Sequence, residues 1–492
     1  KDVFITSLKD RIFNTVFLKD NKITDQQIFH FIQNFISKIT KNIQTGGTII
    51  DINKIIQTRK MKIYTINEPN ELLEFIERNI KPKEIEKKER GEVFTPMKLV
   101  NEMLDKLPKS VWKNKNLKWL DPATGMGNFP IAIYMKLMDG LKEEMNDIEI
   151  RKKHILENML YMVEINKKNC YLVKKILCEN TYRLNLFEGS FLDYKTDLLF
   201  DIVVGNPPFQ NTSSEGERKA LNHNLWSVFI NETFKMINTN GYLLFITPIS
   251  WMSPTSNNKD VFYNHYIVFL NIKECEKYFK EVGSEFCYYL IKKTKKKKET
   301  NVICQYDKNI YSSKILIDGV DFLPILLTKE SLSIIKKFYN NTISKVSFDT
   351  KSELHKTTKK HLINKCDKDF IYPIRHTASH QNLCSKIKHS LSDKKKILLN
   401  LSGYLDPIYD NGKFGFTQAQ MYLVTENKDY INVLNSNLYK FIFKICKWSG
   451  FNIDKIYKNI PYIKEFISNN NLYMLFNLNK EEIDLINEIG RW

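Results

Sequence analysis

The sequence lacks the patterns that mark membrane-spanning and metal-binding proteins. None of its apolar runs approaches the roughly 20 residues that a helix needs to cross a bilayer. Its eight cysteines include no Cys-x-x-Cys pair, and no histidine pair stands beside them at a metal-binding spacing. The chain opens at Lys1 with neither a methionine nor a signal-peptide pattern. We therefore expect reduced, mostly buried thiols, no metal, no membrane contact, and a cytoplasmic protein that starts inside a longer gene product or after a removed tag.

Acidic side chains are scarce relative to basic ones. Lys and Arg number 75 against 56 Asp and Glu, which gives a formal net charge of +19 over 492 residues. Basic side chains that displace condensed counterions supply most non-specific affinity for nucleic acids, so the surplus favours a polyanionic partner. An AT-rich genome, whose codons raise Lys, Asn and Ile together, would produce the same surplus without any ligand. Charge alone leaves both interpretations open.

The chain reads as three regions, and its length suits about two to four domains. In residues 1–88 apolar positions recur at three- and four-residue spacing, which predicts helices. In residues 89–293 short β-rich runs alternate with helical segments, as in a parallel sheet with crossover helices. Residues 294–492 lack that alternation, and we expect a separate α+β domain there. Six lysines within residues 292–298 indicate a solvated loop or junction, with phosphate contact as the alternative.

The middle region is predicted to be a doubly wound, Rossmann-like α/β domain. Its expected strands are residues 117–121, 160–164, 184–189, 201–205, 242–247 and 285–291. Its expected helices are residues 97–107, 129–145, 167–178 and 223–237.

A glycine-containing turn, Asp-Pro-Ala-Thr-Gly-Met-Gly-Asn-Phe, follows the first expected strand at residues 121–129. Gly125 and Gly127 allow a tight bend and the close approach of a ligand, and the N–H groups that open the next helix favour a carboxylate or phosphate. A tight turn without a ligand is the alternative. Glu164 ends the second strand, where such folds bind the two hydroxyls of a ribose. Together the two features suggest a nucleoside cofactor.

The fourth expected strand ends in Asn206-Pro207-Pro208-Phe209. Two consecutive prolines fix the backbone, remove two N–H donors and leave carbonyl groups available at the end of the strand. The side-chain carbonyl of Asn206 and the backbone carbonyl of Pro207 would offer two acceptors to a primary amine, while Phe209 offers a face to a flat ring. A rigid turn capped by Asn206 is the alternative.

In this order the motifs resemble those of γ-class N6-adenine DNA methyltransferases, the TaqI-like enzymes of type II restriction-modification systems. The resemblance starts with Gly-Glu-Val-Phe-Thr-Pro at residues 91–96 and continues through the glycine turn, Glu164 and residues 187–193 to Asn206-Pro207-Pro208-Phe209. It extends through residues 241–251 and 282–289, with weaker echoes at 401–407 and 447–452 that resemble segments of target-recognition domains.

The resemblance implies S-adenosyl-L-methionine as methyl donor and adenine N6 in double-stranded DNA as acceptor. Thr95 and the glycine turn would hold the methionine part, Glu164 the ribose, and either Ser190 or Asp193 the adenine of the cofactor. The expected cofactor-binding residues are Thr95, Asp121, Ala123, Gly125, Gly127, Glu164, Ser190, Asp193 and Asn206. The expected catalytic residues are Asn206, Pro207 and Phe209.

The implied mechanism begins with an adenine flipped out of the duplex. Phe209 would stack on one face of the base and Phe286 on the other, while Asn206 and Pro207 accept the two N6 hydrogens. No metal or covalent nucleophile is needed. The expected DNA contacts in the C-terminal region, each with a solvated surface position as its alternative, are Lys359, Lys360, Arg375, His376, His380, Lys413, Gln418 and Gln420.

Other classes of function stay open at this stage. Methyltransferases that modify amino nitrogens of RNA or protein resemble this chain over the catalytic fold alone, and a DNA-binding module without chemistry is a further alternative. A fused nuclease is not expected, because residues 1–90 contain no convincing Pro-Asp followed by Asp/Glu-x-Lys. We expect a monomer that binds double-stranded DNA, with a cognate restriction endonuclease as a further candidate partner.

Overall fold

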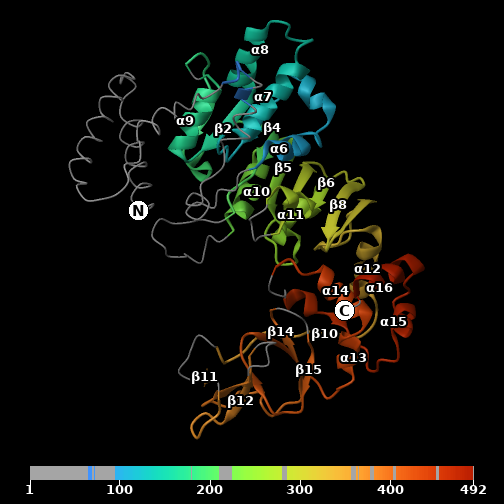
Figure 1. Ribbon diagram of the computed structural model, residues 1–492. Helices are drawn as coiled ribbons and strands as arrows, with labels where there is room; N and C mark the ends of the chain where they lie inside the picture. Colours follow the sequence, from blue (N-terminus) through green and yellow to red (C-terminus); the bar gives the residue numbers. More distant parts are fainter. Residues whose placement is uncertain are drawn as a thin grey trace, which may run out of the picture. The chain divides into compact units, whose positions relative to one another are not determined.

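The structure is a computed structural model of the chain (Figure 1). It describes residues 65–68, 71–72, 95–178, 180–209, 224–279, 285–355, 362–363, 365–376, 382–402, 406–449 and 454–490. The chain divides into two compact units, Lys1–Lys62 and Ile63–Trp492, and all described residues belong to the second. The helices predicted in residues 1–88 lie almost entirely outside the described residues.

A nine-stranded sheet has the strand order β3-β2-β1-β4-β5-β7-β6-β8-β9 (Figure 1). Its first five strands in that order run parallel, and β7 lies antiparallel between β5 and β6. The strands that match the prediction are β1 (Trp119–Asp121), β2 (Leu160–Glu164), β3 (Asn185–Glu188), β4 (Phe200–Gly205), β5 (Ile237–Pro248) and β7 (Phe286–Lys292). The sheet also contains β6 (Tyr266–Ile272).

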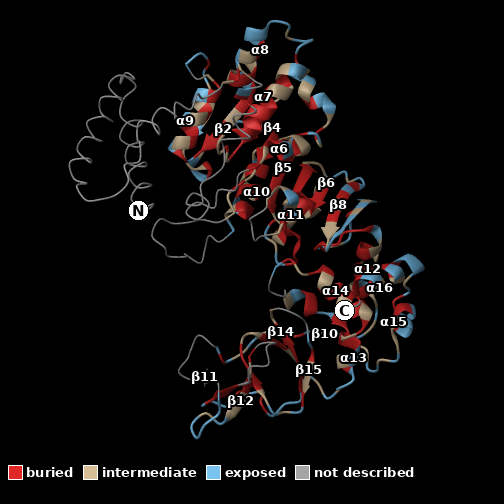
Figure 2. Cartoon of the chain, in the orientation of Figure 1, coloured by how far each residue is buried: buried red, intermediate tan, exposed pale blue. Residues whose placement is uncertain are grey.

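Helices cover both faces of this sheet, as the buried strands in Figure 2 indicate. Ile202 and Val204 of β4 belong to one apolar cluster, whereas Val203 between them belongs to the other, because successive side chains of a strand point to opposite faces. The first cluster contains α6 (Met97–Leu104), α7 (Asn128–Gly140) and α9 (Lys167–Ile176); the second contains α10 (Leu225–Lys235) and α11 (Lys259–Tyr263). The expected doubly wound, Rossmann-like α/β fold is confirmed.

Strand pairing and packing extend across both ends of the middle region. The sheet continues beyond residue 293 with β8 (Thr300–Tyr306) and β9 (Asn309–Ile315), so the lysines at 292–298 occupy the connection between β7 and β8. At the other end, the Ile66 N–H donates to the Ile176 carbonyl at 3.0 Å, and Ile66 and Leu72 are buried in the cluster that contains α9. A run of lysines predicts that a segment is exposed to solvent. It does not predict whether the sheet continues beyond that segment.

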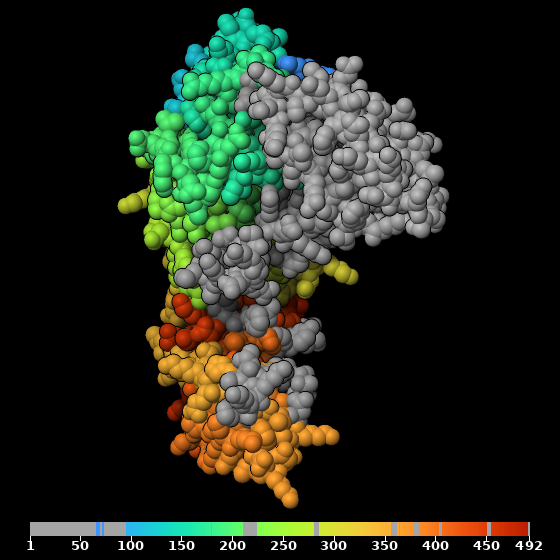
Figure 3. Space-filling view, turned by 90° about the vertical axis from the view of Figure 1, so that its left-hand side faces the viewer, coloured from blue at the N-terminus to red at the C-terminus, as the bar shows by residue number. Residues whose placement is uncertain are grey.

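The C-terminal region combines helices with short strands, as predicted, and forms the orange and red surface in Figure 3. It shares an apolar cluster with the nine-stranded sheet. The Leu323 N–H donates to the Met252 carbonyl at 2.9 Å, and within the region Trp448 Nε1 donates to the Leu323 carbonyl, also at 2.9 Å. Its helices are α12 (Lys329–Asn340), α13 (Tyr430–Leu434), α14 (Asn437–Ile445), α15 (Asn469–Leu475) and α16 (Lys480–Gly490).

The strands of this region form small sheets. One sheet has the order β11-β13-β12-β16, another β15-β14-β17, and β10 pairs with β18. Their bounds are β10 (Lys345–Val346), β11 (Leu362–Ile363), β12 (Tyr372–Arg375), β13 (Asn382–Ser385), β14 (Lys396–Asn400), β15 (Ile408–Asp410), β16 (Gly415–Phe416), β17 (Gln420–Val424) and β18 (Ile460–Pro461). Within the described ranges, no helix is both long and apolar enough to span a bilayer.

The expectation of reduced thiols is wrong for one pair of cysteines. Cys366 and Cys384 form a disulfide, with Cα atoms 5.1 Å apart. The bonded residues are 18 positions apart and meet because β13, which carries Cys384, pairs with β11. No local spacing motif signals this contact. The remaining cysteines are free, and all of them except Cys178 are buried.

Candidate active site

The predicted site residues meet where the strand order of the sheet reverses. From β1 the chain builds outward through β2 and β3, while β4 lies on the other side of β1 and continues to β5. Ligands of open α/β sheets bind outside the carboxyl ends of the strands at such a point. The glycine turn follows β1 and Asn206 follows β4, so the structure brings these two motifs together.

The glycine turn is fixed to the end of β2 by backbone hydrogen bonds. The Thr124 N–H donates to the Val163 carbonyl at 3.0 Å, and the Gly125 N–H donates to Glu164 Oε2 at 2.7 Å. Gly127, immediately before α7, has a φ of 95°, a left-handed conformation that glycine adopts without steric cost. The turn therefore enters α7 in a defined geometry.

Glu164 holds two turns together. In addition to the bond from Gly125, its Oε1 accepts a hydrogen bond from the Asn166 N–H at 2.6 Å, and the residue is 6% exposed. A carboxylate oxygen can accept more than one hydrogen bond, so these contacts are compatible with a ribose hydroxyl as a further donor. Binding of ribose by Glu164 stays a prediction, and the structure adds a role in shaping the glycine turn.

Asp121 is a buried carboxyl group at the centre of the site. Its Oδ1 accepts a hydrogen bond from the Ala123 N–H at 3.1 Å. Burial raises the pKa of Asp121 to about 8; the bond from Ala123 opposes this shift, and the negative charge of Glu164 adds to it. Oδ2 of Asp121 and Oδ1 of Asn128 are buried and have no hydrogen-bond partner among the described residues. Two such acceptors suit a ligand that brings N–H donors and positive charge.

Gly205 allows β4 to end directly against Asp121. A Cβ atom at this position would lie 2.9 Å from Asp121 Oδ1, closer than carbon and oxygen atoms pack, and the φ of Gly205 is 154°. The close approach places the following residue, Asn206, beside the glycine turn.

The side chain of Asn206 contacts Thr95, which precedes α6. Asn206 Nδ2 donates to Thr95 Oγ1 at 3.0 Å, and Asn128 Nδ2 donates to the Thr95 carbonyl at 2.7 Å. Thr95 was predicted to hold the cofactor, and the structure brings it to the predicted catalytic residue. The other residues of that motif, 91–94, lie outside the described part of the chain.

Phe209 and Phe286 are neighbours, but their rings do not face each other across a gap. Their ring centroids are 5.3 Å apart with an interplanar angle of 44°. Phe286 is only 1% exposed, whereas Phe209 is half-buried. Because the rings contact each other directly, no flat base fits between them, and the prediction that Phe286 covers the opposite face is corrected. Phe286 supports Phe209 from the core side.

The segment after β3 carries the remaining predicted cofactor residues. Ser190 caps a short helix (Phe191–Asp193), with its Oγ accepting from the Leu192 N–H at 3.2 Å, and Asp193 is exposed. Sequence reasoning missed Ile165 and Leu192, whose side chains are 69% and 42% exposed beside these strand ends. An apolar residue directly after a strand-ending carboxylate was the available signal for Ile165.

Two of the predicted DNA contacts are buried and lie in a polar network. Gln420 is 1% exposed, and its Nε2 donates to the His376 carbonyl at 2.9 Å and to Asn400 Oδ1 at 2.7 Å. His376 Nδ1 lies 2.7 Å from Thr417 Oγ1. Gln420 and His376 therefore hold strands together and do not face a duplex. They resembled surface residues in sequence because the apolar pattern of such short strands is weak.

The other predicted DNA contacts differ in exposure. Lys413 is exposed and its ammonium lies 5.3 Å from the ring centre of Phe414, while Arg375 and Gln418 are partly exposed. Lys359, Lys360 and His380 lie outside the described residues.

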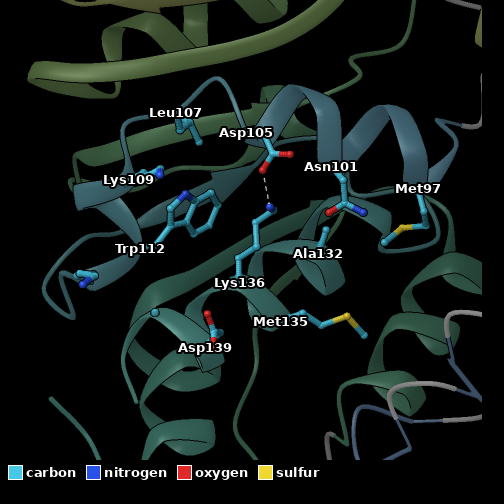
Figure 4. Close-up of a pocket in the computed structure, with 12 residues that line it drawn as sticks. Met97, Asn101, Asp105, Leu107, Lys109, Trp112, Ala132, Met135, Lys136 and Asp139 are labelled. Atoms are coloured by element: carbon cyan, nitrogen blue, oxygen red, sulfur yellow. Dashed lines mark hydrogen bonds and ion pairs between the residues drawn. The ribbon is translucent and has the colours of Figure 1, made fainter. Parts of the chain in front are cut away.

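A pocket of about 630 Å³ lies between α6, α7 and the short helix Lys109–Lys113 (Figure 4). Lys136 pairs with Asp105 at 2.6 Å and lies 5.6 Å from the ring centre of Trp112. None of the predicted site residues lines this pocket. It is distinct from the motif residues at the carboxyl edge of the sheet.

Comparison with known proteins agrees with these motifs. Residues 130–283 match the family model described as Eco57I restriction-modification methylase. An uncharacterized adenine-specific methylase of Mycoplasma pneumoniae is 23% identical over 354 residues, covering 54% of this chain and 82% of its own length. The predicted resemblance to adenine methylases of restriction-modification systems is thereby confirmed.

Two solved structures show limited likeness. The type IIL restriction-modification enzyme MmeI in complex with DNA has a TM-score of 0.49 at 12% identity, covering 82% of this chain and 70% of that one. The DrdV–DNA complex has a TM-score of 0.49 at 14% identity, covering 85% of this chain and 58% of that one.

Proposed function

We propose that this chain is a site-specific DNA methyltransferase that moves the methyl group of S-adenosyl-L-methionine to N6 of adenine within a restriction-modification system. The observation that carries the proposal is the meeting of Asn206 with the glycine turn at the reversal point of the sheet. The motif predicted to bind an amine follows β4, and the motif predicted to bind a nucleoside follows the adjacent strand β1. The matches to adenine methylases support the choice of base.

The buried acceptors of the site fit this cofactor. The methionine part carries an ammonium group, and Asp121 Oδ2 and Asn128 Oδ1 offer it two acceptors. Glu164 would accept from the ribose hydroxyls, and the exposed apolar side chains of Ile165 and Leu192 would contact the adenine ring. When bound, S-adenosyl-L-methionine supplies a methyl group on a positively charged sulfur.

The residues after β4 would hold the acceptor. Asn206 Oδ1 and the Pro207 carbonyl accept the two hydrogens of the adenine amine, so that its lone pair faces away from them. Phe209 stacks on the base and offsets part of the few kcal/mol that flipping it out of a duplex costs. After transfer, the amine nitrogen bears the methyl group and releases one proton.

The C-terminal region would recognise the duplex, with the exposed Lys413 on phosphate and the partly exposed Arg375 as a base or phosphate contact. A cognate endonuclease and a monomeric state belong to the same proposal. The predicted contact of Lys360 stays a proposal from sequence, because that residue lies outside the described ranges.

The test is transfer of labelled methyl from S-adenosyl-L-methionine to unmodified duplex DNA of mixed sequence, to RNA and to a protein extract in parallel. The Asn206→Ala variant serves as control, and sequencing then locates N6-methyladenine. We expect labelled DNA alone, at adenine within one motif. Label on RNA or protein alone would replace the DNA assignment with an amino-nitrogen methyltransferase of another substrate class.

A further inference from the structure

The amide of Asn206 can work as proposed in only one of its two orientations. Its oxygen must face the adenine amine, because the amide nitrogen would oppose one hydrogen-bond donor with another. A half-turn about the last side-chain bond exchanges the two groups with almost no change in shape. The amide must therefore be held in place with its nitrogen away from the base.

We propose that Thr95 is a positioning residue that anchors the nitrogen side of the Asn206 amide while its oxygen is presented to the adenine amine. This inference rests on the proposed methyl transfer and assigns Thr95 a role beyond cofactor contact. Thr95 Oγ1 accepts the hydrogen bond from Asn206 Nδ2 at 3.0 Å. A hydroxyl can also donate, so the adenine amine selects the orientation by donating to Asn206 Oδ1, and Thr95 then holds the amide nitrogen on the other side. Thr95 and Asn206 are 111 residues apart in the chain.

Thr95 is itself held in place by the helix that follows the glycine turn. It is 6% exposed, and its carbonyl accepts from Nδ2 of Asn128, the first residue of α7, at 2.7 Å. One threonine thus links the helix that begins at the proposed cofactor site with the asparagine of the proposed acceptor site.

The helix behind Thr95 is tied to the strand behind Phe209. Glu102 on α6 accepts hydrogen bonds from the hydroxyls of Tyr278 and Tyr288, at 2.8 and 2.7 Å. Burial raises the pKa of Tyr288 far above its ordinary value, so its hydroxyl stays a donor. Tyr288 lies on β7, two residues from Phe286, which supports Phe209. The positions of Thr95 and the stacking ring are therefore set by one framework.

The contact role and the positioning role of Thr95 predict different kinetics. A residue that holds the cofactor affects cofactor affinity first. A residue that orients Asn206 affects the rate of transfer, because a misplaced group near the reacting atoms costs up to about a hundredfold in rate. The comparison of rate with affinity separates the two.

The experiment compares Thr95→Val, which keeps the shape and removes the acceptor, with Thr95→Ser, which keeps the hydroxyl. For each variant we would measure single-turnover transfer to duplex DNA, the cofactor Kd by calorimetry without DNA, and thermal unfolding. We expect Thr95→Val to lose about ten- to a hundredfold in rate with the cofactor Kd changed less than about threefold, and Thr95→Ser to recover most of the rate.

Three outcomes would overturn the inference. Thr95→Val could transfer at the wild-type rate, Thr95→Val could weaken cofactor binding as much as it slows transfer, or Thr95→Ser could be as slow as Thr95→Val. If Thr95→Val does not fold, Thr95→Ala replaces it with the same expected result. Absence of methyl transfer by the wild-type chain would instead remove the proposed function on which the inference rests.

Discussion

Phe209 and Phe286 lie with their ring centroids 5.3 Å apart, which joins the segment after β4 to the start of β7. Phe279 contacts the far side of this pair, with its ring centroid 5.3 Å from that of Phe286. The half-buried ring of Phe209 is thus backed by two further aromatic rings, and its position is set by the core beneath it.

Replacing Phe209 by Ala should weaken capture of the flipped base. Loss of one stacking ring typically costs about 1–3 kcal/mol per base, so we expect the KM for DNA to rise by roughly five- to a hundredfold. The cofactor Kd, measured without DNA, should be nearly unchanged, and Phe209→Tyr should retain stacking. Equal losses of DNA and cofactor affinity would contradict the stacking role.

Replacing Asn206 by Ala should nearly abolish transfer and leave cofactor binding largely intact. The substitution removes an acceptor from the adenine amine, and removal of one such group at a reacting centre costs about 10²–10³ in kcat. Single-turnover assays and calorimetry measure the two quantities. Turnover near the wild-type rate would eliminate Asn206 as a catalytic residue.

Asp121 should make both stability and cofactor affinity depend on pH. Its pKa is raised to about 8, so the folded chain holds this proton more tightly than the unfolded chain. The stability from this group is complete below the ordinary pKa near 3.8 and declines as pH rises through about 8. Asp121→Asn should flatten that part of the profile measured by urea unfolding.

Cofactor affinity should change in the opposite direction. A cationic ammonium group favours the ionised form of Asp121, so affinity should rise by up to about tenfold per pH unit between about pH 6 and 8. Calorimetry over this range tests the sign. An affinity that is flat in the wild type, or equally steep in Asp121→Asn, would show that another group is responsible.

Lys413 should contribute to DNA affinity without reading sequence. Its backbone N–H donates to Asp410 Oδ1 at 2.9 Å, and Asp410 forms a buried ion pair with Lys396, so the loop that carries Lys413 is fixed. Lys413→Ala should lower the slope of log affinity against log salt by about 1. The control is Lys395→Ala, an exposed lysine that already pairs with Glu426 at 2.6 Å. An equal effect of both substitutions would indicate non-specific charge.

Most of the fold could be predicted because its signals are local. Buried parallel strands appear in the sequence as short apolar runs, and the residue types at their ends indicate which groups they can bind. Contacts between distant segments could not be predicted. The bond between Thr95 and Asn206 spans 111 residues, and the disulfide of Cys366 and Cys384 depends on a strand pairing that no spacing motif encodes. For the same reason the sequence does not predict the burial of Gln420, which is a candidate DNA contact by residue type.

Strand β7 runs from the carboxyl edge of the sheet to the opposite edge, and it therefore places the lysine loop at 292–298 away from the site residues. Phe286 lies beside Pro248 at the carboxyl edge of the sheet, whereas Lys292 lies beside Tyr242 at the opposite edge. The seven residues of β7 separate Phe286, which supports the ring of Phe209, from the lysine loop at 292–298 by roughly 20 Å. Since the Debye length is about 8 Å in physiological salt, the loop is electrostatically screened from a duplex at the carboxyl edge. If the duplex binds at the carboxyl edge as proposed, part of the net charge of +19 does not contact it, and the total charge overstates the number of phosphates that would be neutralised.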